Sequence, residues 1–159
     1  MSSRTEALAS RVEATTRQVI ASVEPLDERQ WNTPCAGEGC SVGTTVHHIG
    51  AIHGLALGLL QGLAEGQPLP AFTWDDAHAM NAQHATEFAT CDKQETLDLL
   101  QQNSERAVEF IRGLDDEQLE RSSPWETLAP GESFSVERII IDDLIDHPVS
   151  HLASIRASV

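Results

Sequence analysis

Two histidines one helical turn apart are the residues of this chain best suited to chemistry. His147 and His151 stand at positions i and i+4, which places both imidazoles on one face of a helix. Two inward-facing imidazoles at this spacing are a common arrangement for binding a divalent metal. The competing interpretation is a pair of structural histidines, each with its own hydrogen-bond partner, and the pair alone leaves both open. Their helix face continues an apolar stripe made of Ile140, Leu144 and Ile155.

A third ligand would have to come from another helix, and His48 is the best candidate. It lies on the apolar stripe of the segment 42–63, before the middle of that helix, whereas His147 and His151 lie after the middle of the last helix. If these two helices are antiparallel, His48 lies at the same height along the bundle axis as the other two histidines. If they are parallel, the heights differ by several ångströms. We therefore predict a metal site formed by His48, His147 and His151.

The four other histidines are weaker candidates for chemistry. His53 faces inward, nearly two turns from the level of His48, and we interpret it as a packed residue or a residue behind the ligands. His47 lies near a row of glycines, so we expect it to be exposed or at an interface. His78 follows Asp75 at i+3 and is expected to be structural, and His84 has no local partner.

Three further groups of residues have a structural and a functional interpretation. Asp142, Asp143 and Asp146 precede His147; most should be solvated, although one could orient a ligand imidazole. Pro148 is expected to kink the last helix, because it cannot donate to the Leu144 carbonyl. The tryptophans are expected either to line a pocket or to plug the core at loop ends: Trp31, Trp74 and Trp125.

The cysteines are few and odd in number: Cys35, Cys40 and Cys91. They do not form a disulfide framework, so we expect a reducing, cytoplasmic location. Cys35 and Cys40 lack the second pair that a zinc knuckle needs, and a catalytic thiol or a redox pair is a minor hypothesis. The N-terminus lacks the pattern of a signal peptide, and the longest apolar run, 49–60, is too short to span a bilayer.

Composition excludes several classes of function. The chain has 159 residues, which predicts a single domain over 1–159, and its net charge is −15. So acidic a surface repels phosphate backbones and anionic lipids, and the chain has no tyrosine and few other aromatic residues. We therefore expect neither nucleic acid nor membrane among the partners, and we expect a small-molecule substrate.

Helical periodicity runs through almost the whole chain. We predict helices over 4–23, 42–63, 75–89, 92–112 and 136–157, with Ser3, Ser41 and Asp92 as N-caps and Gly113 as a stop. Strand-like alternation is absent, so the predicted fold is an all-α four-helix bundle. The linker 64–74 can run the length of the bundle, which permits up-down-down-up order and makes the helices carrying His48 and His151 antiparallel.

Two internal patterns bear on how the helices pack. The segments 26–30 and 37–42 resemble 114–118 and 131–136, which predicts two similar helical hairpins. Gly50, Gly54, Gly58 and Gly62 form a row on one helix. This row indicates either close approach of a neighbouring helix or the interface of a homodimer.

The order of these motifs resembles that of the DinB-like (DinB/YfiT) superfamily. Trp31, the glycine-rich loop, Ser41-Val42 and His48-Ile49 are similar to the entry to the family's second helix. The segment from His147 to His151 is similar to its final H-x-x-x-H helix. The resemblance implies a bundle of up-down-down-up order, often dimeric, with a divalent metal, usually zinc or nickel, held by His48, His147 and His151. Characterised relatives include enzymes that use mycothiol, bacillithiol or glutathione, such as maleylpyruvate isomerase.

Three functional hypotheses follow from such a site. A metal held by three neutral imidazoles keeps its charge and an open position. A low-molecular-weight thiol bound there would become a nucleophile for transfer to a small electrophile, and a bound water would make the protein a hydrolase. The non-enzymatic alternative is a metal-binding dimeric stress protein.

Overall fold

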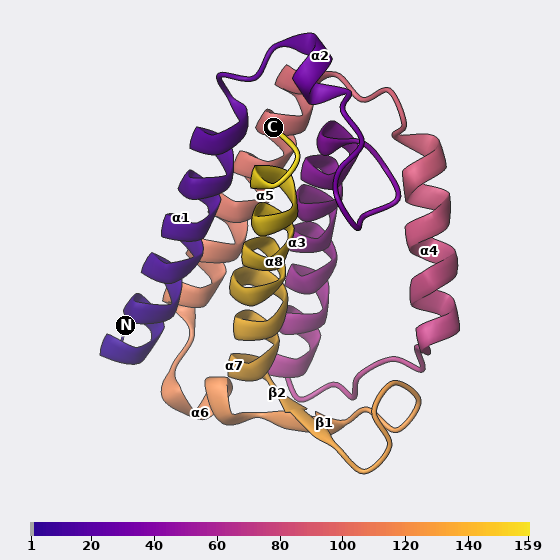
Figure 1. Cartoon of the computed structure of the whole chain (residues 1–159). Coiled ribbons are helices and arrows are strands. Elements are labelled where there is room, and N and C mark those ends of the chain that lie inside the picture. The colour runs from indigo at the N-terminus through magenta and orange to yellow at the C-terminus, as the bar shows by residue number, and fades with distance from the viewer. Residues whose placement is uncertain (1) are drawn as a thin grey trace.

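The computed structural model describes residues 2–159, and most of them are helical (Figure 1). Four long helices pack side by side, which confirms the predicted four-helix bundle. The first three are α1 (Ser3–Val23), α3 (Val42–Ala64) and α5 (Lys93–Gly113). The fourth consists of three consecutive segments: α7 (Val136–Ile139), the π-helix η1 (Ile140–Asp146) and α8 (His147–Arg156).

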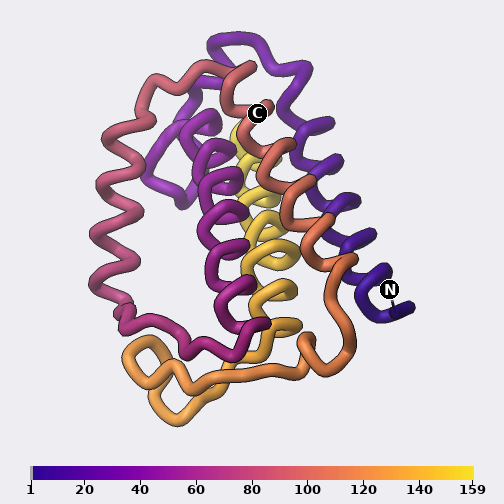
Figure 2. Tube along the Cα trace, turned by 180° about the vertical axis from the view of Figure 1, so that it is seen from behind, coloured from indigo at the N-terminus to yellow at the C-terminus, as the bar shows by residue number. Residues whose placement is uncertain are grey.

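The helices follow the up-down-down-up order that the sequence predicted. From the end where α1 begins, α1 runs up, α3 and α5 run down in parallel, and the C-terminal helix runs up again (Figures 1 and 2). The connection between α3 and α5 differs from the expectation. Residues 65–73 stay at one end of the bundle, and the helix α4 (Trp74–Glu87) makes the return run. None of the residues of α4 is buried, so this helix lies on the outside of the bundle.

Short elements connect the long helices. They are α2 (Glu28–Trp31), α6 (Asp116–Glu120), and the antiparallel strands β1 (Ser122–Pro124) and β2 (Ser133–Ser135). The expectation that strands would be absent is therefore wrong for this hairpin. A strand of three residues is too short to show an alternating pattern in the sequence. Among residues 2–159 no helix is long and apolar enough to cross a membrane.

The predicted internal repeat is visible in the local geometry. Asp27 caps α2 and Asp115 caps α6, each through a reciprocal capping box with a glutamine three residues later. Ser41 and Ser135 then cap α3 and α7. At the N-terminus, however, the cap of α1 is Ser2 with Thr5 as its partner, rather than the expected Ser3.

The core consists of two apolar clusters separated by a polar layer. One cluster includes Leu60, Ile111 and Leu144, and the other includes Ile49, Leu100 and Leu152. Between these levels along the helices lie buried polar side chains: Thr15 and Thr16 of α1, His53 of α3 and Ser104 of α5.

Close packing of α3 against α5 explains part of the glycine row. A methyl group on Gly50 would lie 3.2 Å from the backbone of Leu100, and one on Gly54 would lie 3.0 Å from the Asn103 side chain. The structure therefore supports close helix approach at these two positions. Gly58 has open space around it. The homodimer interpretation stays a prediction.

Substitutions in this row are expected to change stability in opposite directions. Gly58→Ala should raise the free energy of unfolding by about 1 kcal/mol, because alanine is the better helix former and nothing obstructs its methyl group. Gly50→Ala should lower it by about 1–3 kcal/mol, because α5 must move to admit the methyl group. Urea unfolding followed by circular dichroism measures both. If both substitutions change the free energy of unfolding in the same direction, the packing described around Gly50 and Gly58 is wrong.

The C-terminal helix widens immediately before Pro148. The backbone N–H of His147 donates to the Asp142 carbonyl, five residues earlier, which is the hydrogen bond of a π-helix. Pro148 is the second residue of the regular helix α8, which continues directly from this segment. A π-helical segment thus lies immediately before Pro148, and the kink expected at this residue stays a prediction.

Candidate metal centre

The structure brings together the three histidines that the sequence singled out. His147 Nε2 lies 3.2 Å from His48 Nε2 and 3.0 Å from His151 Nε2. The candidate ligand atoms of all three residues lie within 4.8 Å of one another. Because α3 and α8 are antiparallel, His48 meets the other two at the same level, as predicted. Three nitrogen atoms that converge in this way can hold one metal ion.

Burial keeps two of these imidazoles, His48 and His147, in the form that binds a metal. Removal from water, with His151 as the next contribution, lowers the pKa of His48 to about 4 and that of His147 to about 3. Both rings are therefore neutral at pH 7, and a metal would not have to displace a proton from either of them.

One of the ligand candidates has a carboxylate behind it. Glu38 Oε1 lies 2.9 Å from His151 Nδ1, on the far side of the ring from His147. The separation is that of a hydrogen bond, although the carboxylate lies off the direction of the ring proton. Sequence reasoning did not single out Glu38 because no local pattern connects a loop residue with a helix more than a hundred positions later.

Two of the three aspartates that precede His147 keep exposed side chains, as expected, and the third is partly buried. Asp142 pairs with Arg138 at 3.3 Å, and Asp146 is exposed. Asp143 is partly buried, and burial, with Asp142 as a second cause, raises its pKa to about 6. A carboxylate contacts the histidine cluster from the 32–41 loop instead.

Two histidines that the sequence indicated as weak candidates for chemistry form a second pair beside the cluster. His47 Nδ1 lies 2.8 Å from His84 Nε2, and the His47 ring stacks on Phe88 with centroids 3.8 Å apart. The His84 ring also meets His48 edge-on at 5.5 Å. His47 is therefore half-buried rather than exposed, because α4 folds back along α3 and supplies His84, a partner distant in the sequence. The alternative that His47 lies at an interface between two copies stays a prediction.

His53 is the most deeply buried histidine of the chain. Its side chain is 0% exposed, and neither ring nitrogen has a hydrogen-bond partner. Burial alone lowers its pKa to about 4. Its charge would also lower the pKa of His147, which places the residue behind the cluster, in agreement with the packed position predicted. His78 lies exposed on α4, outside the cluster.

The cysteines and tryptophans lie mainly in structural positions. Cys35 is buried, and burial raises its pKa and that of Cys91, which disfavours a thiolate at either position. Trp31 and Trp125 are buried and donate to the backbone carbonyls of Cys91 and Pro70. Trp74 is 61% exposed at the start of α4.

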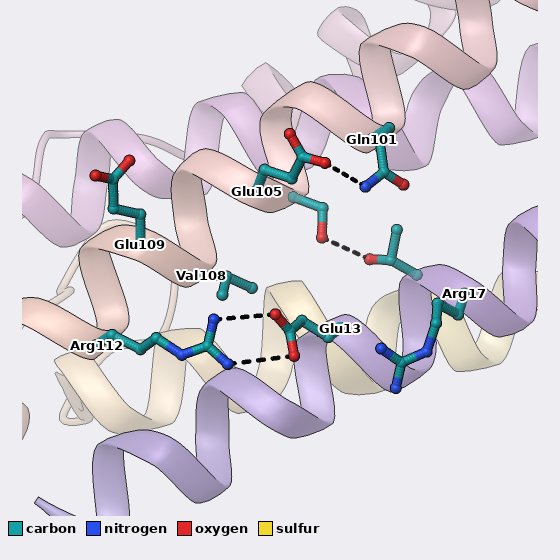
Figure 3. Close-up of a pocket in the computed structure, with 9 residues that line it drawn as sticks. Glu13, Arg17, Gln101, Glu105, Val108, Glu109 and Arg112 are labelled. Carbon is teal, nitrogen blue, oxygen red and sulfur yellow. Dashed lines mark hydrogen bonds and ion pairs between the residues drawn. The ribbon is translucent and has the colours of Figure 1, made fainter.

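A groove of about 430 Å³ lies between α1 and α5, away from the histidine cluster (Figure 3). Two of its charged groups pair with each other, Arg112 with Glu13 at 3.0 Å, and the hydroxyls of Thr16 and Ser104, which also line the groove, lie 2.8 Å apart. No histidine or cysteine lines this groove in the part of the chain that the structure describes. The chemistry-bearing residues are therefore at the cluster.

Comparison with known proteins gives a consistent result. A family model described as the DinB superfamily matches residues 11–155, and no curated protein matches the sequence. Among solved structures, YfiT from Bacillus subtilis is described as a probable metal-dependent hydrolase with an unusual four-helix bundle topology. It has a TM-score of 0.75 and 21% identity, and the match covers 99% of this chain and 87% of YfiT.

Two further solved structures share the fold. An uncharacterized protein from Clostridium difficile 630 has a TM-score of 0.79 and 17% identity, with coverage of 99% of this chain and 96% of that protein. DfsB, a sibling lethal factor precursor, has a TM-score of 0.75 and 17% identity, with coverage of 99% and 95%. At these identities the likeness establishes the arrangement of the helices.

Proposed function

Since the chain belongs to the DinB superfamily, we propose that it is a divalent-metal-dependent enzyme that activates a small nucleophile at His48, His147 and His151. The observation that carries the proposal is the convergence of three imidazole nitrogens from α3 and α8. The resemblance found in the sequence favours zinc or nickel, and imidazole nitrogen is a good ligand for both metals.

The donor set fits a metal of this kind. The rings are partly buried, the pKa values of His48 and His147 are well below neutrality, and no lysine or arginine pairs with the cluster among residues 2–159. In that part of the chain the cluster contains three ligands rather than four. Such a set leaves a coordination position for a substrate, as catalytic sites do.

A divalent metal held by His48, His147 and His151 would lower the pKa of a thiol or water bound to it. The protein itself would hold the three rings at fixed distances from one another and limit which molecules reach them. The paired His47 and His84 lie beside His48 and bring a further polar surface close to the cluster.

Our first candidate reaction is transfer of a low-molecular-weight thiol to a small electrophile. Hydrolysis at the same residues is the second, and it is favoured by the fold shared with YfiT. A non-catalytic metal-binding protein is the remaining alternative. We expect the protein to act on small molecules.

Metal content and a cobalt spectrum test this proposal together. Plasma mass spectrometry of the purified, untagged protein should find about one zinc or nickel per chain, and the His48→Ala variant should lose it. In protein reconstituted with Co²⁺, adding a low-molecular-weight thiol should produce a sulfur-to-metal charge-transfer band. A Co²⁺ spectrum that does not respond to thiols, together with cleavage of small esters or amides, would favour hydrolysis. No metal after reconstitution would refute both reactions.

A further inference from the structure

The two ring nitrogens of His151 face different partners. Its Nε2 lies 3.0 Å from His147 Nε2, inside the cluster, and its Nδ1 lies 2.9 Å from Glu38 Oε1. An imidazole binds a metal through one nitrogen only, and the group that contacts the other nitrogen decides which one is free.

We propose that Glu38 is the positioning residue of the metal centre, which keeps the proton of His151 on Nδ1 and leaves Nε2 free to bind. This inference rests on the proposed metal site and adds a residue that touches the site only through His151. The carboxylate lies within hydrogen-bond distance of Nδ1 but off the direction of its proton, so we expect a small rotation of the Glu38 side chain or of the ring to complete this hydrogen bond when Nε2 binds a metal. It also supplies negative charge next to a ligand, which increases the ligand's basicity.

The loop that carries Glu38 is built to place it. The N–H of Cys35 donates to the Cys40 carbonyl at 2.8 Å, which closes the hairpin. Gly37 and Gly39, on either side of Glu38, have φ values of 79° and 72°, in the left-handed region that favours glycine. These two turns fix the direction in which the Glu38 side chain leaves the backbone.

The same loop is fastened to the helix that it supports. The N–H of Ala36 donates to Ser158 Oγ at 2.8 Å, and Ser158 Oγ donates in turn to the Ser154 carbonyl at the end of α8. Glu38 and Ala36 thus contact the C-terminal helix region at two points. These contacts hold the loop against the C-terminal helix.

The environment of Glu38 is unusual for a surface-loop carboxylate. Its side chain is only 19% exposed, and no lysine or arginine pairs with it in the described chain. A charge withdrawn from water is unfavourable unless an opposite charge is near. A divalent cation held by the three histidines would provide that charge. Glu38 itself is outside the ligand cluster, so the open position is kept.

Zinc affinity measured by competition with a chromophoric chelator tests the inference. We expect Glu38→Ala to weaken zinc binding about 10–100-fold, as the loss of a carboxylate behind a ligand histidine does in metal sites. Glu38→Gln keeps an acceptor but removes the charge, and should give a smaller loss. Glu109→Gln removes the same charge from the exposed side of α5 and should bind zinc as the wild type does.

Two further measurements separate positioning from folding. Circular dichroism and thermal unfolding of the metal-free variants should match the wild type, because the contact is at the periphery of the bundle. Nitrogen-15 spectra of the zinc-loaded protein should show His151 protonated on Nδ1, and Glu38→Ala should lose this single form. If the Glu38 variants are unfolded at a temperature at which the wild type is folded, Glu38 is needed for folding and does not act by positioning His151 alone.

The possible failures are distinguishable. If the wild type binds zinc, His147→Ala does not, and Glu38→Ala retains the affinity of the wild type, the inference about Glu38 is wrong and the metal site stands. If the wild type binds no zinc, the inference fails together with the proposed function.

Discussion

Replacing His147 with alanine is expected to abolish tight metal binding and the stability that comes with it. His147 is the central member of the cluster, since its Nε2 is the atom nearest to both His48 Nε2 and His151 Nε2. A ligand that binds only the folded state stabilises it by about 2.7 kcal/mol at a concentration one hundred times the Kd. For a chain of this length that corresponds to a rise of about 5–10 °C in Tm.

Thermal unfolding with and without zinc measures this effect. The wild type should show the rise, and His147→Ala and His151→Ala should not. His78→Ala is the matched control, because it removes an imidazole from the exposed face of α4 and leaves the cluster intact. A zinc-dependent rise of the same size in His147→Ala would rule out the cluster as the metal site.

The second large effect is loss of stability on mild acidification of the metal-free protein. Burial lowers the pKa of His53 and His48 to about 4, and that of His147 to about 3, from an ordinary value of 6.5. Between pH 6.5 and 4 the unfolded chain therefore binds more protons than the folded chain. Stability is fully present above pH 6.5 and falls as the pH is lowered.

For a fully buried group such as His53 the loss amounts to about 1.4 kcal/mol for each pH unit in this interval. Asp143 acts in the opposite direction, because its pKa is raised to about 6 and the folded state gains its proton first. One carboxyl group offsets only part of the effect of three buried imidazoles. We therefore expect the free energy of unfolding to fall steeply as the pH is lowered from 6.5 to 4.

Urea unfolding at pH 7.0, 6.0 and 5.0 measures this decline. The variant His53→Leu should be more stable than the wild type at pH 5 and should show a shallower dependence on pH, because it removes a buried ring without hydrogen-bond partners. Equal midpoints at pH 7 and pH 5 for the wild type would contradict neutral burial of these rings.

The sequence alone predicted the three clustered histidines because their signals are local. His147 and His151 share a helix face at i and i+4, and His48 lies on the inward stripe of its own helix. The only non-local step was the helix order, which the length of the 64–74 connection suggested. That suggestion led to the correct order although the return run is made by α4.

The sequence did not identify Glu38 and His84 as neighbours of the cluster, because their signals are not local. Each reaches the cluster through contacts between distant segments: Glu38 with His151 of α8, and His84 with His47 of α3. Neither residue stands in a periodic pattern that indicates its neighbour. The π-helical turn before Pro148 was also beyond a pattern analysis, because periodicity in so short a segment does not separate it from an α-helix.

The repeated local plan of the two halves bears on the origin of the site. Ser41 and Ser135 hold equivalent capping positions, and the residues twelve places after them are His53 and His147. Duplication of one ancestral helical hairpin would have put a histidine at this place in both copies. In the second copy the ring became part of the cluster, and in the first it stays in the core without a partner. If the two halves arose in this way, His53 is the counterpart in the first half of the metal-ligand candidate His147.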